Sequence, residues 1–195
     1  MDMRIGLFCL FTFAFCLLTS CQRAAAPIAV SNRPVAINDV PQTNVPMPPT
    51  KPLTDMKWTL TGGSEQTLKN HAGKVVILDF WATYCGPCRE EIPHLNSILA
   101  KYGPDKIVII GLNVGGDEDL ALVPEFTKIT KIDYPIAVPE DALNSYIFAQ
   151  DTAIPQTAIF DRSGRLVKKF IGYGPTVKAE LDRVVETAVN TLAPQ

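Results

Sequence analysis

A chain of 195 residues is long enough for one domain with appendages, and its 47% hydrophobic residues can supply a substantial core. The formal net charge of −2 gives no basic excess, which argues against nucleic acid as a partner. The sequence also has no run of like charges of the kind that forms an acidic or basic interaction tail.

Residues 1–20 have the pattern of a secretory signal rather than of a folded element. Arg4 precedes a nearly unbroken apolar run, residues 5–18, which is short for a membrane span. The segment "LTSC", residues 18–21, resembles the lipobox of bacterial lipoproteins. In that family the signal is cleaved before the cysteine, which makes Cys21 the expected first mature residue and lipidation site. The alternative is an ordinary secretory signal in which Cys21 occurs by chance.

Residues 21–52 are rich in proline and poor in charge, and they show no helical or strand periodicity. Such a composition predicts a disordered or polyproline tether that holds a domain away from the lipid headgroups. We therefore expect a signal in residues 1–20, a tether in residues 21–52 and one globular domain in residues 53–195.

The globular part alternates between strand and helix patterns. A strand, a Gly-Gly turn and a polar return are expected in residues 57–70, and a buried β-branched run in residues 74–80 predicts a central strand. The elements expected after it are a helix from the cysteines to Gly103, a strand (106–114), a helix (115–130), an extended piece (134–141), a short helix (141–148), a hairpin (157–160 with 165–170) and a last helix (176–192) with Thr176 as N-cap. This order indicates an α/β domain with helices on both faces of a sheet.

Two cysteines, Cys85 and Cys88, follow the central strand in the segment "DFWATYCGPC". Cys9, Cys16 and Cys21 belong to the signal or the lipid anchor, so this pair holds the remaining thiols. As a structural staple the pair closes almost no loop and adds little stability. A zinc site needs four ligands, and the mature chain adds only two histidines, His71 and His94, so we expect no metal.

Redox chemistry suits the pair better than either alternative. Free N–H groups at the start of a helix stabilise a Cys85 thiolate, which is the nucleophile in disulfide exchange. Cys88, one turn later, can attack the mixed disulfide and release the substrate. Gly86 leaves the approach to Cys85 uncrowded, and Pro87 stiffens the turn where a missing N–H has no cost. His94 is expected to be an ordinary surface or boundary residue.

The segment "DFWATYCGPC" closely resembles the thioredoxin active site, and "WATYCGPCREEIP" resembles the TlpA/ResA group of exported, membrane-tethered thiol–disulfide oxidoreductases. The resemblance covers about residues 53–192 and implies a thioredoxin-like fold with a central mixed sheet. Residues 115–148 are similar to the extra central block, or insertion, of that group. The stretch "AIPQTAIFDRSGRLV" resembles the family's cis-proline segment, which implies a cis Ile154–Pro155 bond beside the cysteines and an Ile154 backbone that pairs with substrate.

The resemblance also implies roles for two acids, which match family acids by their position in the motif. Asp79 matches the buried acid of thioredoxin, and Glu91 matches the acid before "IP" in ResA-like proteins; either can accept the Cys88 proton. The alternatives are a hydrogen-bonded structural role for Asp79 and a solvated first-turn position for Glu91. The residues expected to contact substrate are Trp81, Gly86, Pro87, Ile154 and Pro155. Trp81 is also expected to shield the disulfide or simply to pack in the core.

The resemblance implies a thiol–disulfide reductase outside the cytoplasm, lipid-anchored on the periplasmic side or the cell surface. We expect a monomer whose only redox group is the Cys85–Cys88 disulfide, with no separate cofactor. Its expected clients are exported thiol proteins such as apocytochrome c, and a membrane electron donor of the DsbD/CcdA kind would re-reduce it. A disulfide donor or isomerase, a peroxiredoxin-like peroxidase and a copper-binding chaperone are the alternatives; the last two are disfavoured because their cysteine motifs are absent.

Overall fold

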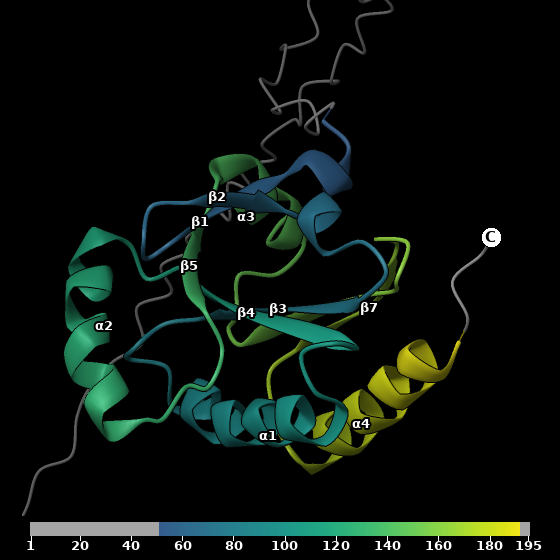
Figure 1. The fold of residues 1–195 in the computed structure, drawn as a ribbon. Helices are drawn as coiled ribbons and strands as arrows, with labels where there is room; N and C mark the ends of the chain where they lie inside the picture. The colour runs from purple at the N-terminus through teal and green to yellow at the C-terminus, as the bar shows by residue number, and fades with distance from the viewer. Residues whose placement is uncertain (1–50, 192–195) are drawn as a thin grey trace, which may run out of the picture. The chain divides into compact units, whose positions relative to one another are not determined.

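A computed structural model describes residues 51–191 (Figure 1). The predicted signal, the lipidation site Cys21 and nearly all of the predicted tether lie outside the described residues. None of the helices in residues 51–191 is both long and apolar enough to cross a membrane.

The described part of the chain forms one sheet of seven strands in the order β2-β1-β5-β4-β3-β6-β7. Strand β3 runs parallel to β4, and β4 runs parallel to β5; the remaining neighbours are antiparallel. The strands are β1 (Lys57–Leu60), β2 (Glu65–Thr67), β3 (Val75–Trp81), β4 (Ile107–Asn113), β5 (Ile136–Pro139), β6 (Gln156–Phe160) and β7 (Leu166–Ile171). The helices are α1 (Gly86–Tyr102), α2 (Asp117–Ile129), α3 (Asp141–Ile147) and α4 (Pro175–Asn190), with short 3-10 turns η2 (Leu53–Asp55) and η3 (Leu68–His71).

Helices cover both faces of this sheet, as the sequence predicts. Figure 1 shows α1 and α4 side by side below the sheet and α3 on the opposite side. Strand β3 is buried along its whole length, and its side chains alternate between the two faces. Val75 and Ile77 pack with α1 and α4 on one face. Leu78 and Phe80 pack with η3 and α3 on the other.

Two local predictions are wrong. Helix α4 begins at Pro175 after an N-cap at Gly174, with no side-chain cap, so Thr176 lies within the first turn instead of capping it. Proline fits this first position because the missing N–H has no partner in a helix there. His94 is buried, with 7% of its surface exposed, because α4 packs over α1 and brings Asp182 to 2.8 Å from its Nε2.

The alternation of β3 also decides where chemistry can occur. Asp79 and Trp81 point to the same face as Val75 and Ile77, which is the face that α1 covers. Since β3 ends at Trp81 and α1 begins at Gly86, the loop of residues 82–85, which ends in Cys85, connects the C-terminal end of the strand to the start of the helix.

Candidate active site

Cys85 and Cys88 form a disulfide at the N-terminus of α1. Cys85 is the N-cap residue, and its Sγ accepts a hydrogen bond from the backbone N–H of Cys88 at 3.2 Å. Cys85 keeps 6% of its surface exposed and Cys88 only 1%. The cysteine that an incoming partner can reach is therefore Cys85, while Cys88 lies behind it.

Gly86 and Pro87 begin the helix between the two cysteines. Leaving aside its chain neighbours and its own helix backbone, a methyl group added at Gly86 would meet no atom within 4 Å, so Gly86 lies against open space. The fixed φ of proline suits the first turn of the helix, where its missing N–H breaks no bond.

The Ile154–Pro155 peptide bond is cis, as the resemblance implies. Ile154 packs against the apolar cluster that contains both cysteines, so this loop lies beside the disulfide. Among the described residues, neither the N–H nor the C=O of Ile154 has a hydrogen-bond partner. A groove next to this loop is lined by Tyr84, Val114, Asn144, Phe148, Thr152, Ala153 and Ile154. An extended peptide could lie here, with backbone groups of Ile154 free to pair with it.

Trp81 lies beneath the disulfide and is fully buried. Its ring stacks on Phe126 of α2 at a centroid distance of 5.0 Å, within the cluster that holds Cys85, Cys88 and Ile92. A side chain with no exposed surface does not touch a bound substrate, so its place among the substrate-binding residues is wrong. Trp81 shields the disulfide and packs the core at the same time.

Asp79 and Glu91 meet on the inner side of the disulfide, both almost fully buried. Glu91 is three residues after Cys88 on α1, so the two side chains are neighbours on one helix face. Its Oε1 accepts a hydrogen bond of 2.5 Å from the hydroxyl of Thr157. Thr157 is in turn the register partner of Asp79 on β6, which brings the two acids together. Burial excludes the solvated first-turn position for Glu91.

Tyr134 contacts the acid pair, and no sequence motif predicts this contact. Tyr134 lies in the segment before β5, and its hydroxyl donates a hydrogen bond of 2.9 Å to Asp79 Oδ2. Gly111 on β4 is opposite Asp79 and makes room for this contact, since a Cβ there would lie 3.0 Å from both the Trp81 indole nitrogen and the Tyr134 ring. The remaining oxygens, Asp79 Oδ1 and Glu91 Oε2, have no hydrogen-bond partner among the described residues.

The environment favours the protonated form of both acids. Burial raises the pKa of Asp79 to about 7, against the opposing effect of the hydrogen bond from Tyr134. Burial and the charge of Asp79 raise the pKa of Glu91 to about 8, although the hydrogen bond from Thr157 opposes the shift. Near neutral pH the pair can hold a proton or accept one, which is what a buried thiol must give up to become a nucleophile.

In the part of the chain that the structure describes, no group of three or more His, Cys, Asp or Glu side chains is placed to hold a metal ion. The side chains gathered around the two sulfurs are apolar or acidic. This arrangement supports proton transfer and sulfur exchange within a protected pocket.

Comparison with known proteins identifies the family. The Redoxin family model matches residues 42–185. The chain belongs to the Redoxin family. It is a TlpA/ResA-like, thioredoxin-fold protein and a thiol–disulfide oxidoreductase.

Two relatives and one solved structure show how far the similarity extends. The thiol-disulfide oxidoreductase ResA of Geobacillus kaustophilus (strain HTA426) is 32% identical over 137 residues, which span 69% of this chain and 72% of the relative. The thioredoxin-like protein YneN of Bacillus subtilis (strain 168) is 27% identical over 133 residues, or 68% of this chain and 75% of YneN. The crystal structure of a thioredoxin-family thiol:disulfide interchange protein from Chlorobium tepidum TLS superposes with a TM-score of 0.58 at 28% identity, covering 72% of this chain and 98% of that one.

Proposed function

We propose that this oxidoreductase is an exported, lipid-anchored reductant of protein disulfides. The observation that supports this best is the disulfide at the start of α1, in which Cys85 is the more accessible cysteine and a buried acid pair lies beside Cys88. An accessible nucleophile, a buried resolving thiol and a nearby proton acceptor are the three parts that a two-step dithiol exchange requires.

In the proposed cycle the reduced Cys85 thiolate attacks one sulfur of a client disulfide. A mixed disulfide forms, and the client's other sulfur leaves as a thiolate that takes up a proton. Cys88 then gives its proton to the acid pair of Asp79 and Glu91, and its sulfur attacks Cys85. The Cys85–Cys88 disulfide forms, and the client's second thiolate leaves and is protonated. Two electrons pass from the protein to the client. Of the two protons that the client thiolates take up, one comes from solvent, because Cys85 starts as a thiolate, and the other balances the proton that Cys88 releases to the acid pair. A dithiol donor must then restore the enzyme.

The direction of electron flow rests on the residues between the cysteines. Gly86 and Pro87 are the dipeptide of thioredoxin, a reductant with a potential of about −270 mV. A titration of the Cys85–Cys88 couple against a dithiol buffer tests the direction. A value near or below about −250 mV supports a reductant, and a value above about −180 mV makes the protein a disulfide donor or isomerase instead.

We place the protein outside the cytoplasm, held by a lipid on Cys21 and re-reduced by a membrane electron donor of the DsbD/CcdA kind. The basic start, apolar run and lipobox-like segment of residues 1–21 support this placement. Its proposed clients are exported thiol proteins, apocytochrome c among them. Metabolic labelling with a radioactive fatty acid tests the anchor: label on the wild-type chain and none on Cys21→Ser is expected, whereas equal labelling of both refutes lipidation at Cys21.

Two variants test the roles of the cysteines. We expect Cys85→Ser to abolish reduction of insulin disulfides, because it removes the nucleophile. Cys88→Ser retains the first attack and should accumulate mixed disulfides that a thiol reagent releases. Unchanged insulin turnover by Cys85→Ser would rule out this mechanism, and trapping by Cys85→Ser instead would exchange the two roles.

A further inference from the structure

Asp119 is a buried carboxylate that the proposed cycle leaves without a role. It lies in the first turn of α2 beside two other acids, Asp117 and Glu118, which are exposed, whereas Asp119 keeps only 4% of its surface accessible. Placing a carboxylate in the interior is unfavourable unless hydrogen bonds compensate for the lost water. The donors that compensate Asp119 therefore show what holds it there.

Those donors come from the ends of the two central strands. The backbone N–H of Thr83 lies 3.1 Å from Asp119 Oδ2, the Thr83 hydroxyl donates to Oδ1, and Asn113 Nδ2 donates to Oδ2 at 2.7 Å. Burial opposes ionisation of Asp119, but the hydrogen bonds from Thr83 and Asn113 outweigh it and lower its pKa. Asp119 is thus a fixed anion that joins the insertion helix α2 to the ends of β3 and β4.

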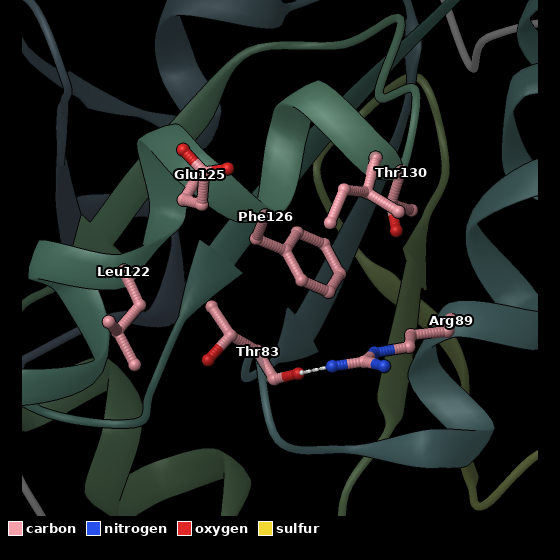
Figure 2. A pocket seen from close by; sticks show the side chains of 7 residues that line it. Thr83, Arg89, Leu122, Glu125, Phe126 and Thr130 are labelled. Atoms are coloured by element: carbon pink, nitrogen blue, oxygen red, sulfur yellow. Dashed lines mark hydrogen bonds between the residues drawn. The ribbon is translucent and has the colours of Figure 1, made fainter.

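Thr83 is held from its other side as well. Arg89, one turn into α1, donates from Nη2 to the carbonyl oxygen of Thr83 at 2.7 Å, and its guanidinium lies 5.4 Å from the centre of the Phe126 ring on α2. Figure 2 shows this arrangement, with Arg89 directed at Thr83 and Phe126 above them in the groove between α2 and the start of α1. All polar groups of Thr83 are therefore engaged within the described residues, two by Asp119 and one by Arg89.

The space around Asp119 is closed by the turn before its helix. A Cβ on Gly115 would lie 2.4 to 2.5 Å from the Asp119 carboxyl group, a separation that side-chain atoms do not tolerate. Gly115, in the turn between β4 and α2, therefore packs directly on this carboxylate. The backbone of the turn, the two strand ends and the helix all depend on Asp119 keeping one position.

Cys85 is two residues after Thr83, and its own N–H donates to the carbonyl of Ala82 at 3.1 Å. Residues 82–85 thus form a tight loop whose position is set where Thr83 is attached. In the reduced enzyme no disulfide ties Cys85 to Cys88, so the attachment of Thr83 must hold Cys85 against the free N–H groups of α1. Those N–H groups stabilise the thiolate only while the sulfur stays at the helix N-terminus.

We propose that Asp119 is a positioning residue for disulfide exchange: through Thr83 it fixes the loop of residues 82–85 and holds Cys85 at the N-terminus of α1. The inference rests on the proposed function, since it assigns Cys85 as the nucleophile. It makes the insertion helix part of the machinery that activates Cys85, although that helix supplies no reacting atom.

The test measures how fast the Cys85 thiol reacts as pH changes. The reduced full chain, in detergent, is treated with iodoacetamide from pH 5 to 10, and modification of Cys85 is quantified by peptide mass spectrometry. Asp119→Asn and Thr83→Val are compared with the wild type, and Thr83→Ser and Glu118→Gln serve as matched controls. Thr83→Val removes the hydroxyl donor without changing any charge, and Glu118→Gln removes one exposed charge from the same helical turn.

We expect Asp119→Asn and Thr83→Val to lower the Cys85 alkylation rate at pH 7 by about tenfold and to move its pH midpoint upward. Thr83→Ser keeps the hydroxyl and should restore the wild-type profile, while Glu118→Gln should not change it. Equal profiles for all variants, with only the melting temperature lowered, would give Asp119 a purely structural role and overturn the proposal. A downward midpoint in Asp119→Asn alone would also overturn it, because the carboxylate would then act through its charge.

The wild-type profile separates this inference from the proposed function. If the wild-type Cys85 titrated like a free thiol, near a pKa of about 8.5, it would not be an activated nucleophile, and both the proposed function and the role of Asp119 would be refuted. An activated wild-type Cys85 whose reactivity survives in both variants refutes the role of Asp119 alone.

Discussion

Replacing Glu91 by Gln should change the pH dependence of stability in a direction that the structure fixes. Glu91 has a higher pKa in the fold than in the unfolded chain, so the folded state binds its proton more tightly. The stability contributed by the protonated form is fully present below the unfolded pKa and is lost as pH rises through the folded pKa. Wild-type stability should therefore fall between about pH 5 and pH 9, and this fall should be smaller in Glu91→Gln, which has no proton to lose at this position.

The size of the effect follows from the shift. The pKa of Glu91 rises from 4.5 to about 8, and at roughly 1.4 kcal/mol per pKa unit its ionisation costs on the order of 5 kcal/mol more in the fold than in the unfolded chain. At pH 5 a protonated Glu91 and a glutamine are nearly equivalent, and both can accept the hydrogen bond from Thr157. At pH 9 the variant should be the more stable protein by several kcal/mol.

The assay is urea unfolding of the oxidised protein at pH 5, 7 and 9, with the variant and the wild type measured in parallel. Glu90→Gln is the matched control, since it removes an exposed carboxylate from the adjacent position of the same helix. If the stability difference between Glu91→Gln and the wild type changed by less than about 0.5 kcal/mol from pH 5 to pH 9, as at an ordinary surface site, the argument from burial would be wrong.

Two further predictions concern the surroundings of the acids. Tyr134→Phe removes the hydrogen bond that lowers the pKa of Asp79, so that pKa should rise further and the pH profile of insulin reduction should shift upward; an unchanged profile contradicts this. Gly111→Ala should destabilise the protein by about 1 to 3 kcal/mol in urea unfolding, because its methyl group would press on the Trp81 indole. Gly62→Ala, whose methyl group would enter open space, should change stability by less than about 0.5 kcal/mol, and equal losses for both variants would refute the packing argument.

The sequence predicted the fold well where local signals decide it. The β-branched run of β3, the helix stop at Gly103 and the hairpin of β6 and β7 each carry their information within a few neighbouring residues. His94 and Thr176 were misplaced for reasons that no local pattern carries. The burial of His94 depends on α4, whose Asp182 is 88 residues away in the sequence. Gly174 is the N-cap of α4 and Pro175 its first residue, so Thr176 is not the cap.

Within the site, the family motifs correctly predicted the positions of Cys85 and Cys88 and the cis bond before Pro155, and they pointed to Asp79 and Glu91 as candidate acids. They could not show that the acids share one buried space, because the link runs through Thr157, which lies opposite Asp79 in the sheet and is 66 residues from Glu91 in the sequence. Side chains alternate along β3 in the structure, so Asp79 lies on the face that α1 covers, and only the packed helix α1 shows that Glu91 lies over that face. Motifs record residue types at fixed spacing, while the ionisation of a buried acid depends on which distant side chains surround it.

The insertion of residues 115–148 contacts the site at separate places, which argues that it does more than lengthen the domain. Phe126 stacks on the tryptophan beneath the disulfide, Tyr134 donates to the buried Asp79, and Asp119 binds the loop before Cys85. Each contact affects a different quantity: the exclusion of water, the proton affinity of the acid pair and the position of the nucleophile. The effects of Tyr134→Phe and Asp119→Asn should therefore be separable, the first on the acid pair's titration and the second on Cys85 alkylation, because the two residues bind different parts of the site.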